Sequence, residues 1–148
     1  RELIDLGFGR VKLVAVVGKE LHANSIDDLR ELLEEGKLPG LRIASEYVNI
    51  ADRYARDNHL SPYRVIPTWG ASEAFLPEDA DLLIENTQTG QTIAQHDLRI
   101  IDTLFESSAC LIGYKNANSA KEEKIAYITE ILRRPLSETT EKCPEAKR

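Results

Sequence analysis

The chain is poor in the features that mark several classes of protein. It has only two cysteines and no C-x-x-C pair, which argues against a redox motif or a zinc knuckle. Its three histidines, His22, His59 and His96, lie far apart and lack a second ligand at metal-binding spacing, so no metal site is predicted. No apolar run approaches the roughly 20 residues of a membrane-spanning helix. Because disulfide-rich proteins belong to oxidising compartments, the scarcity of cysteine favours a cytoplasmic location.

Basic residues are also in deficit. There are 19 Lys and Arg against 25 Asp and Glu, which gives a formal net charge of −6. Nucleic acids and anionic membranes attract basic surfaces, so neither is expected as a partner. Residues 1–5 contain no basic segment followed by an apolar one and do not resemble a secretory signal. The chain begins without Met, inside what reads as structure, so we expect a fragment that lacks an N-terminal part.

Strand-like and helix-like segments alternate along the chain. The apolar run 11–17 predicts a buried strand, and Ser25 with the acidic residues after it predicts the start of a helix that ends near Gly36. This alternation predicts an α/β fold with a mainly parallel sheet and flanking helices. Further strands are expected at 41–44, 63–66, 81–85, 98–105 and 109–114, and further helices at 48–58, 70–75, 91–96 and 119–134, with Pro135 ending the last.

The stretch 81–93 (DLLIENTQTGQTI) is the most informative for function. An apolar strand ends at the acidic Glu85, and a loop of hydroxyl and amide side chains with Gly90 leads into a helix start. Open α/β sheets bind ligands beyond the carboxyl ends of their strands, and N–H groups at a helix start attract phosphate. Glu85 could accept hydrogen bonds from ribose hydroxyls. The pattern is typical of a sugar-phosphate site, although an ordinary strand-to-helix unit capped by Thr or Asn has the same order.

Five segments together resemble ATP phosphoribosyltransferase, the first enzyme of histidine biosynthesis. They occur in the family's order and at similar spacing, and they cover most of residues 5–134. The segments are 5–13 (DLGFGRVKL), 41–49 (LRIASEYVN), 70–73 (GASE), 80–93 (ADLLIENTQTGQTI) and 107–112 (SSACLI).

The resemblance implies a fold of two lobes like a type II periplasmic binding protein, with the active site between the lobes. Residues 13–106 would form the second lobe with the phosphoribosyl-diphosphate loop. Residues 1–12 would be the end of the first lobe and a crossing, 107–134 a return strand and helix toward the first lobe, and 135–148 a polar tail. The first lobe would be mostly missing, and with it much of the ATP site, so the isolated fragment is expected to be inactive.

The family's substrate loop reads roughly Asp-Leu-Val-Ser-Thr-Gly-Thr-Thr-Leu and corresponds here to residues 85–93. Thr89, Gly90 and Thr92 are retained, and Glu85 replaces Asp. In the implied site, residues 87–92 cradle the 5′-phosphate and Glu85 holds the ribose hydroxyls. The residues implied to bind phosphoribosyl diphosphate are Glu85, Thr87, Gln88, Thr89, Gly90, Gln91, Thr92 and Glu73.

Some assignments within the implied site stay open. Gln88 and Gln91 are bulkier than the residues usual in the family. Glu73 could reach the ribose or a metal-bound water, or could simply favour the dipole of its own helix. Arg53 as a phosphate ligand and Trp69 as an adenine platform are each explained as well by a solvated face or by ordinary packing. No catalytic side chain and no direct metal ligand is assigned.

The implied reaction transfers the phosphoribosyl group from phosphoribosyl diphosphate to N1 of the adenine of ATP and releases diphosphate. Such a displacement depends on positioning and charge stabilisation, and Mg²⁺ carried by the substrate would neutralise the leaving diphosphate. A homo-oligomer is expected, and a regulatory subunit is one of the arrangements known in the family. The alternative is a non-catalytic module that binds a small anion or phosphometabolite, or a regulatory homologue of the same fold.

Overall fold

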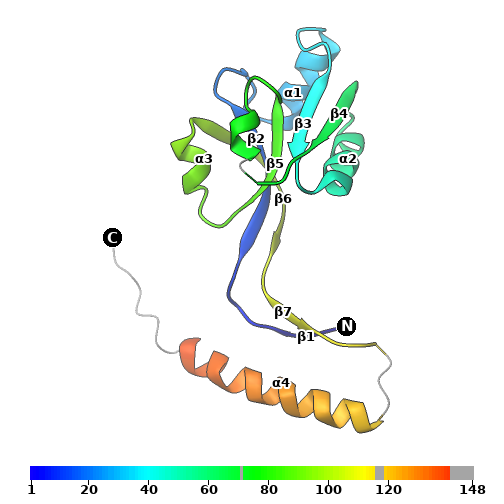
Figure 1. Ribbon diagram of the computed structural model, residues 1–148, viewed down its shortest axis with the longest axis vertical. Coiled ribbons are helices and arrows are strands. Elements are labelled where there is room, and N and C mark those ends of the chain that lie inside the picture. Colours follow the sequence, from blue (N-terminus) through cyan, green and yellow to red (C-terminus); the bar gives the residue numbers. More distant parts are fainter. Residues whose placement is uncertain (71, 116–118, 141–148) are drawn as a thin grey trace. The chain divides into compact units, whose positions relative to one another are not determined.

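Figure 1 shows the computed structural model, which describes residues 1–70, 72–115 and 119–140. The chain divides into two compact units. The larger unit is Val11–Glu106, and the smaller unit combines Arg1–Arg10 with Ser107–Arg148. In the described part of the chain, no helix is both long enough and apolar enough to cross a membrane.

The larger unit is built on a five-stranded sheet in the order β4-β3-β5-β2-β6. β3 is parallel to both β4 and β5, whereas β2 is antiparallel to β5. β2 and β3 are joined through a helix but are not neighbours, so the crossover rule for adjacent parallel strands does not fix their relative direction. The predicted α/β class is confirmed, and the sheet is mixed. The strands are β2 (Val11–Gly18), β3 (Leu41–Ser45), β4 (Tyr63–Pro67), β5 (Leu82–Thr87) and β6 (Leu98–Ser107).

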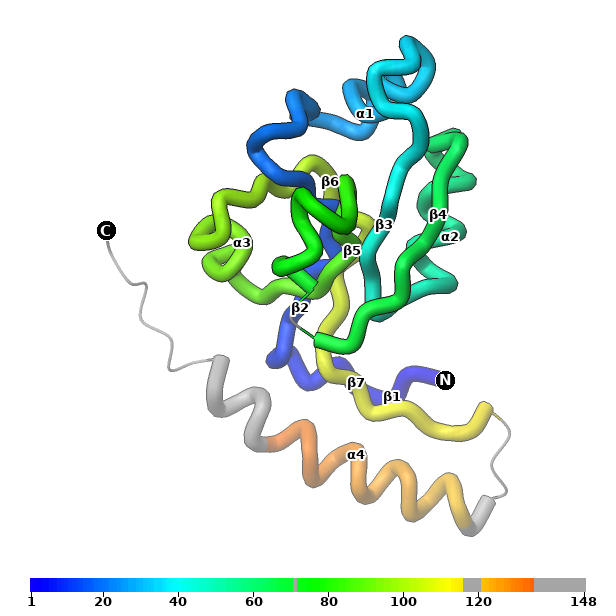
Figure 2. The backbone as a smooth tube through the Cα atoms, turned by 45° about the horizontal axis from the view of Figure 1, so that its top comes forward, coloured from blue at the N-terminus to red at the C-terminus, as the bar shows by residue number. Residues whose placement is uncertain are grey.

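Helices follow the strands much as the sequence predicts. Ser25 caps the first of them, because its hydroxyl accepts a hydrogen bond from the Asp28 N–H at 3.1 Å. In Figure 2, the second helix lies beside β4, and the third lies at the opposite side of the unit. The helices are α1 (Ile26–Glu34), α2 (Val48–Asp57), the 3₁₀ helix η1 (Ser72–Phe75) and α3 (Gln91–Gln95).

The core occupies both faces of the sheet. Leu13, Ala15 and Val17 of β2 pack in one cluster with residues of α1 and α2. Val14 and Val16 pack in a second cluster, with residues of α3 and of the segment that follows η1. Alternate residues of a strand point to opposite faces, so β2 reads as an unbroken apolar run because both of its faces are covered.

The smaller unit pairs two short strands. β1 (Glu2–Asp5) and β7 (Cys110–Ile112) are antiparallel, with Ile4 opposite Leu111. β1 was not predicted from the sequence, because Ile4 is the only buried residue among the four residues of this strand and so short a pattern does not stand out.

The helix of the smaller unit is longer than predicted. α4 spans Ser119–Thr140 and continues through Pro135, so the prediction that Pro135 ends it is wrong. A proline removes one N–H donor from a helix, but its fixed φ of about −65° is itself helical. Residues 135–140, predicted as the start of the polar tail, are therefore helical, and the rest of that tail lies outside the described residues. Ile128, Ile131 and Leu132 of α4 are exposed.

Candidate functional site

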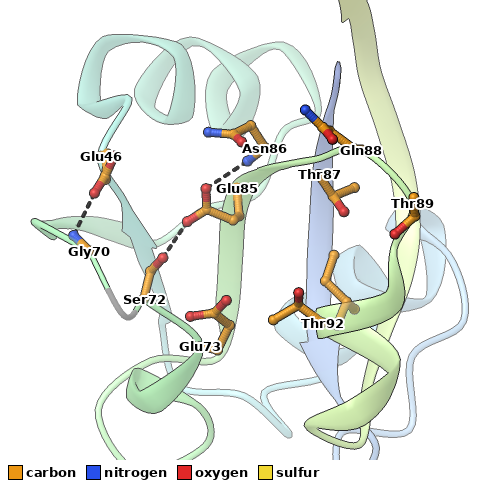
Figure 3. A pocket seen from close by; sticks show the side chains of 11 residues that line it. Glu46, Gly70, Ser72, Glu73, Glu85, Asn86, Thr87, Gln88, Thr89 and Thr92 are labelled. Carbon is orange, nitrogen blue, oxygen red and sulfur yellow. Dashed lines mark hydrogen bonds between the residues drawn. The ribbon is translucent and has the colours of Figure 1, made fainter. Parts of the chain in front are cut away.

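A cavity of about 460 Å³ opens in the larger unit, where β3, β4 and β5 end (Figure 3). These strands are parallel, so their carboxyl ends meet at one edge of the sheet, the usual place for a ligand in an open α/β fold. β3 and β4 contribute residues that follow them, β5 contributes its last three residues and the loop after it, and α3 lines the remaining side. The described residues lining the cavity are Glu46, Gly70, Ser72, Glu73, Glu85, Asn86, Thr87, Gln88, Thr89, Thr92 and Ile93.

Strand β5 carries the middle of the site. It runs to Thr87, two residues beyond the prediction, because Asn86 and Thr87 still pair with Leu13 and Lys12 of β2. Only residues 88–90 then remain as a loop before α3. In a strand, alternate side chains share a face, so Glu85 and Thr87 point to the same side of the sheet. The side-chain amide of Asn86 instead donates a hydrogen bond to the Tyr47 hydroxyl at 2.6 Å.

Threonine hydroxyls close the loop that follows β5. The Gly90 N–H donates to Thr87 Oγ1 at 2.9 Å, and the Gln91 N–H donates to Thr89 Oγ1 at 3.3 Å. Gly90 has a φ of 73°, a left-handed conformation that glycine adopts without strain. Thr87, Gln88, Thr89 and Thr92 line the cavity, whereas Gly90 and Gln91 shape the turn and are not among its lining residues.

Two hydrogen bonds hold the carboxylate of Glu85. The Asn86 N–H donates to Oε1 at 2.8 Å, and the Ser72 hydroxyl donates to Oε2 (Figure 3). Ser72 is almost completely buried, with 2% of its surface exposed. Glu85 itself is half-buried at the cavity wall. Its carboxylate therefore has a defined orientation before any ligand binds.

Carboxylates dominate the charge of the cavity wall. Glu46, Glu73 and Glu85 all line it, and none of the described lining residues is Lys, Arg or His. Glu46 accepts a hydrogen bond from the Gly70 N–H, which links the end of β3 to the loop after β4. A phosphate ligand here would depend on N–H and O–H donors, or would have to arrive with a cation that offsets the negative wall.

Five of the described residues line the cavity without having been predicted as site residues: Glu46, Gly70, Ser72, Asn86 and Ile93. Glu46 and Ser72 lie in two of the five family-like segments, directly after β3 and shortly after β4. Their position at the carboxyl ends of parallel strands was the available signal. Of the predicted set, the structure brings Glu73, Glu85 and the polar loop residues around one cavity.

The two open candidates, Arg53 and Trp69, do not line this cavity. Trp69 precedes Gly70 and is 88% exposed. Arg53 lies at a second cavity of about 430 Å³ between α2 and β6. There the Tyr54 hydroxyl donates to Asp102 Oδ2 at 2.7 Å. Burial, and secondly this hydrogen bond, raise the pKa of Tyr54 above its usual value, so the phenol stays protonated and continues to donate.

Comparison with known proteins finds a family model and relatives that carry the same description. The family model HisG, described as ATP phosphoribosyltransferase, matches residues 1–134. An ATP phosphoribosyltransferase of Saccharolobus solfataricus is 38% identical over 117 residues, which cover 78% of this chain and 37% of the relative. The corresponding protein of Methanocaldococcus jannaschii is 34% identical over 123 residues, 82% of this chain and 40% of the relative. The chain thus spans about two fifths of the length of these relatives.

Solved structures share the fold. The ATP phosphoribosyl transferase (HisG:HisZ) complex from Thermotoga maritima superposes with a TM-score of 0.75 at 20% identity, covering 93% of this chain and 62% of that one. A mutant of ArgBP from T. maritima gives a TM-score of 0.55 at 15% identity, covering 89% and 54%. At such identities the likeness concerns the fold alone, and it confirms the expected periplasmic-binding-protein-like architecture. The family match over residues 1–134 decides the classification, and the chain belongs to the ATP phosphoribosyltransferase family.

Proposed function

We propose that this chain is the part of an ATP phosphoribosyltransferase that binds phosphoribosyl diphosphate. The complete enzyme would transfer the phosphoribosyl group to N1 of the adenine of ATP and release diphosphate, the first step of histidine biosynthesis. One observation carries the proposal: Glu85 and three threonines of the family's substrate loop line a single cavity at the carboxyl ends of parallel strands. The family match supports this reading over a non-catalytic anion-binding module.

The loop would hold the 5′-phosphate with hydroxyl and amide donors. The hydroxyl oxygens of Thr87 and Thr89 already accept backbone N–H groups, so each keeps its own O–H free to donate to a phosphate oxygen. The N–H groups of Thr92 and Ile93, in the first turn of α3, have no carbonyl partner four residues back inside the helix. The Thr92 hydroxyl is a further donor, and all of these donors belong to residues that line the cavity. Several donors on one wall suit an anion with several oxygens.

The ribose would lie against Glu85. Each carboxylate oxygen has two lone pairs, and the bonds from Ser72 and Asn86 occupy one lone pair of each oxygen. One lone pair therefore remains on each oxygen to accept a ribose hydroxyl. Glu73, on η1, lines the same wall and is the second candidate for a ribose or metal-bound water contact.

Mg²⁺ would enter with the substrate. Among the described residues, no group of three or more His, Cys, Asp and Glu side chains is arranged to hold a metal ion. The wall carboxylates Glu46, Glu73 and Glu85 would repel a bare diphosphate, so a diphosphate neutralised by a bound cation suits the cavity better. When bound, the ion would supply charge neutralisation of the leaving group.

Two further proposals concern the rest of the enzyme. Much of the ATP site would lie in the part of the family's length that this chain does not span, so we expect the isolated chain to bind phosphoribosyl diphosphate without turnover. The T. maritima structure is a HisG:HisZ complex, which supports assembly of the complete protein with a second subunit.

The phosphate assignment is tested by calorimetric titration of the chain with phosphoribosyl diphosphate and MgCl₂. Changing Thr89 and Thr92 to Val should weaken binding by about 1.5–3 kcal/mol for each lost hydrogen bond to a charged group, or about ten- to a hundredfold each. Thr103→Val on β6 is the matched control, because Thr103 does not line this cavity. The affinity of this variant for phosphoribosyl diphosphate should equal that of the unaltered chain. Equal affinities in all variants would contradict the assignment.

A further inference from the structure

We infer that Ser72 is a positioning residue that makes this cavity selective for ribose over 2-deoxyribose, by fixing the carboxylate of Glu85. The inference rests on the proposed function, because it takes Glu85 as the acceptor for the ribose hydroxyls. It assigns to Ser72 a role separate from phosphate binding, which belongs to the loop at 87–92. The two roles can therefore be tested independently.

Glu85 needs an external contact to hold one conformation. Its place in β5 fixes the direction of Cβ, but the three torsions beyond it stay free, and the side chain faces an open cavity. The bond from the Asn86 N–H comes from the adjacent residue of the same strand and cannot relate the carboxylate to the rest of the wall. Of the two bonds, only that from Ser72 ties Glu85 to another element, η1.

Ser72 is suited to this role and unsuited to contact the substrate. Its side chain is only 2% exposed, and its single O–H is committed to Glu85 Oε2. A serine this buried offers no donor to a ligand, whereas the carboxylate that it holds is half-exposed at the wall. Figure 3 shows Ser72 pointing across the cavity wall toward Glu85, with Glu73 beside it.

The test compares ribose 5-phosphate with 2-deoxyribose 5-phosphate by calorimetry on the 148-residue chain. Both ligands offer the same phosphate to the loop, and they differ by the single hydroxyl at C2. The unaltered chain should bind the ribose form at least about tenfold more tightly, the usual scale for a hydrogen bond to a charged group. In Ser72→Ala the preference should fall below about threefold, because the affinity for the ribose form falls more than the affinity for the deoxy form, which has one hydroxyl fewer to lose from Glu85.

Two variants separate positioning from general damage. Ser72→Thr keeps the hydroxyl donor and should restore the preference. Thr68→Val is the matched control, because Thr68 is equally buried at 2% exposed and its hydroxyl has no hydrogen-bond partner among the described residues. This control should leave both affinities unchanged. Melting temperatures of all variants show whether any loss of binding follows from loss of fold.

Each other outcome overturns a different statement. Retained preference in Ser72→Ala, or an equal loss of both ligands, would contradict the positioning role. Equal binding of the two sugars by the unaltered chain would remove the inference and leave the phosphate site standing. Binding of neither ligand would overturn the proposed function together with the inference.

Discussion

At the scale of single residues, the site depends on short polar contacts between neighbours in the loop and strand. The hydroxyls of Thr87 and Thr89 accept the N–H groups of Gly90 and Gln91, and Ser72 holds Glu85. The two threonine contacts are local, whereas the contact between Ser72 and Glu85 joins η1 to β5. Side chains of this kind orient donors and acceptors with little loss of conformational entropy on binding.

Gly90 offers a residue-scale prediction with an internal control. Gly90 and Gly36 have φ values of +73° and +71°, and a Cβ at either position would meet nothing closer than 3.7 Å. Alanine at either should therefore cost only the left-handed strain, about 1 kcal/mol of unfolding free energy, measurable by urea denaturation. Only Gly90→Ala should also weaken binding of ribose 5-phosphate, because it disturbs the turn between Thr87 and α3. Identical affinities in the two variants would argue against the loop as the phosphate site.

At the scale of elements, the sequence predicted the strands and helices that have a clear apolar pattern, and it misplaced element ends that depend on pairing between strands. The strand 11–17 was recognisable as an unbroken apolar run, and the helix after Ser25 was recognisable because its buried residues recur at helix spacing. The end of β5 was placed two residues early, because Asn86 and Thr87 are polar and belong to the strand only through pairing with β2. Pro135 was predicted to end the last helix, but α4 continues through it, because one missing N–H donor does not end a helix.

The start of α1 gives an element-scale prediction. Ser25→Ala removes the acceptor of the Asp28 N–H and should lower the unfolding free energy by about 1 kcal/mol, which urea denaturation would detect. A Ser61→Ala control, in the loop before β4, should change stability much less. An equal effect of both variants would show that the Ser25 cap contributes nothing specific.

The same helix start predicts a pH dependence. The Asn24 N–H, which donates to Asp28 Oδ2 at 2.7 Å, and then the Ser25 side chain lower the pKa of Asp28 below its usual 3.8. The ionised form is favoured in the folded state, so its stabilising effect is present above about pH 4 and is lost as the pH falls through the lowered pKa. Asp28→Asn should narrow the difference between urea midpoints at about pH 6 and about pH 3. An unchanged difference would contradict this account.

At the scale of the whole molecule, the residues of the site come together only through the order of the strands in the sheet. That order cannot be read from the sequence. The motif at 85–93 was recognisable because its residues are adjacent in the chain. Glu46 and Ser72 were not recognisable as site residues. The contact of Glu46 with Gly70 and that of Ser72 with Glu85 form only once β3, β4 and β5 lie side by side in parallel. Strand order is set by long-range packing, and no local pattern encodes which strand ends become neighbours.

The central claim is that phosphoribosyl diphosphate binds where β5 ends, and amide chemical shifts of the ¹⁵N-labelled chain test it most directly. On titration with the ligand and MgCl₂, the account predicts saturable shifts that cluster at Ser72, Glu73 and residues 85–93. Residues of the second cavity, such as Asn49 and Phe105, should stay unshifted. Shifts centred on that second cavity, or no saturable shift at all, would contradict the account.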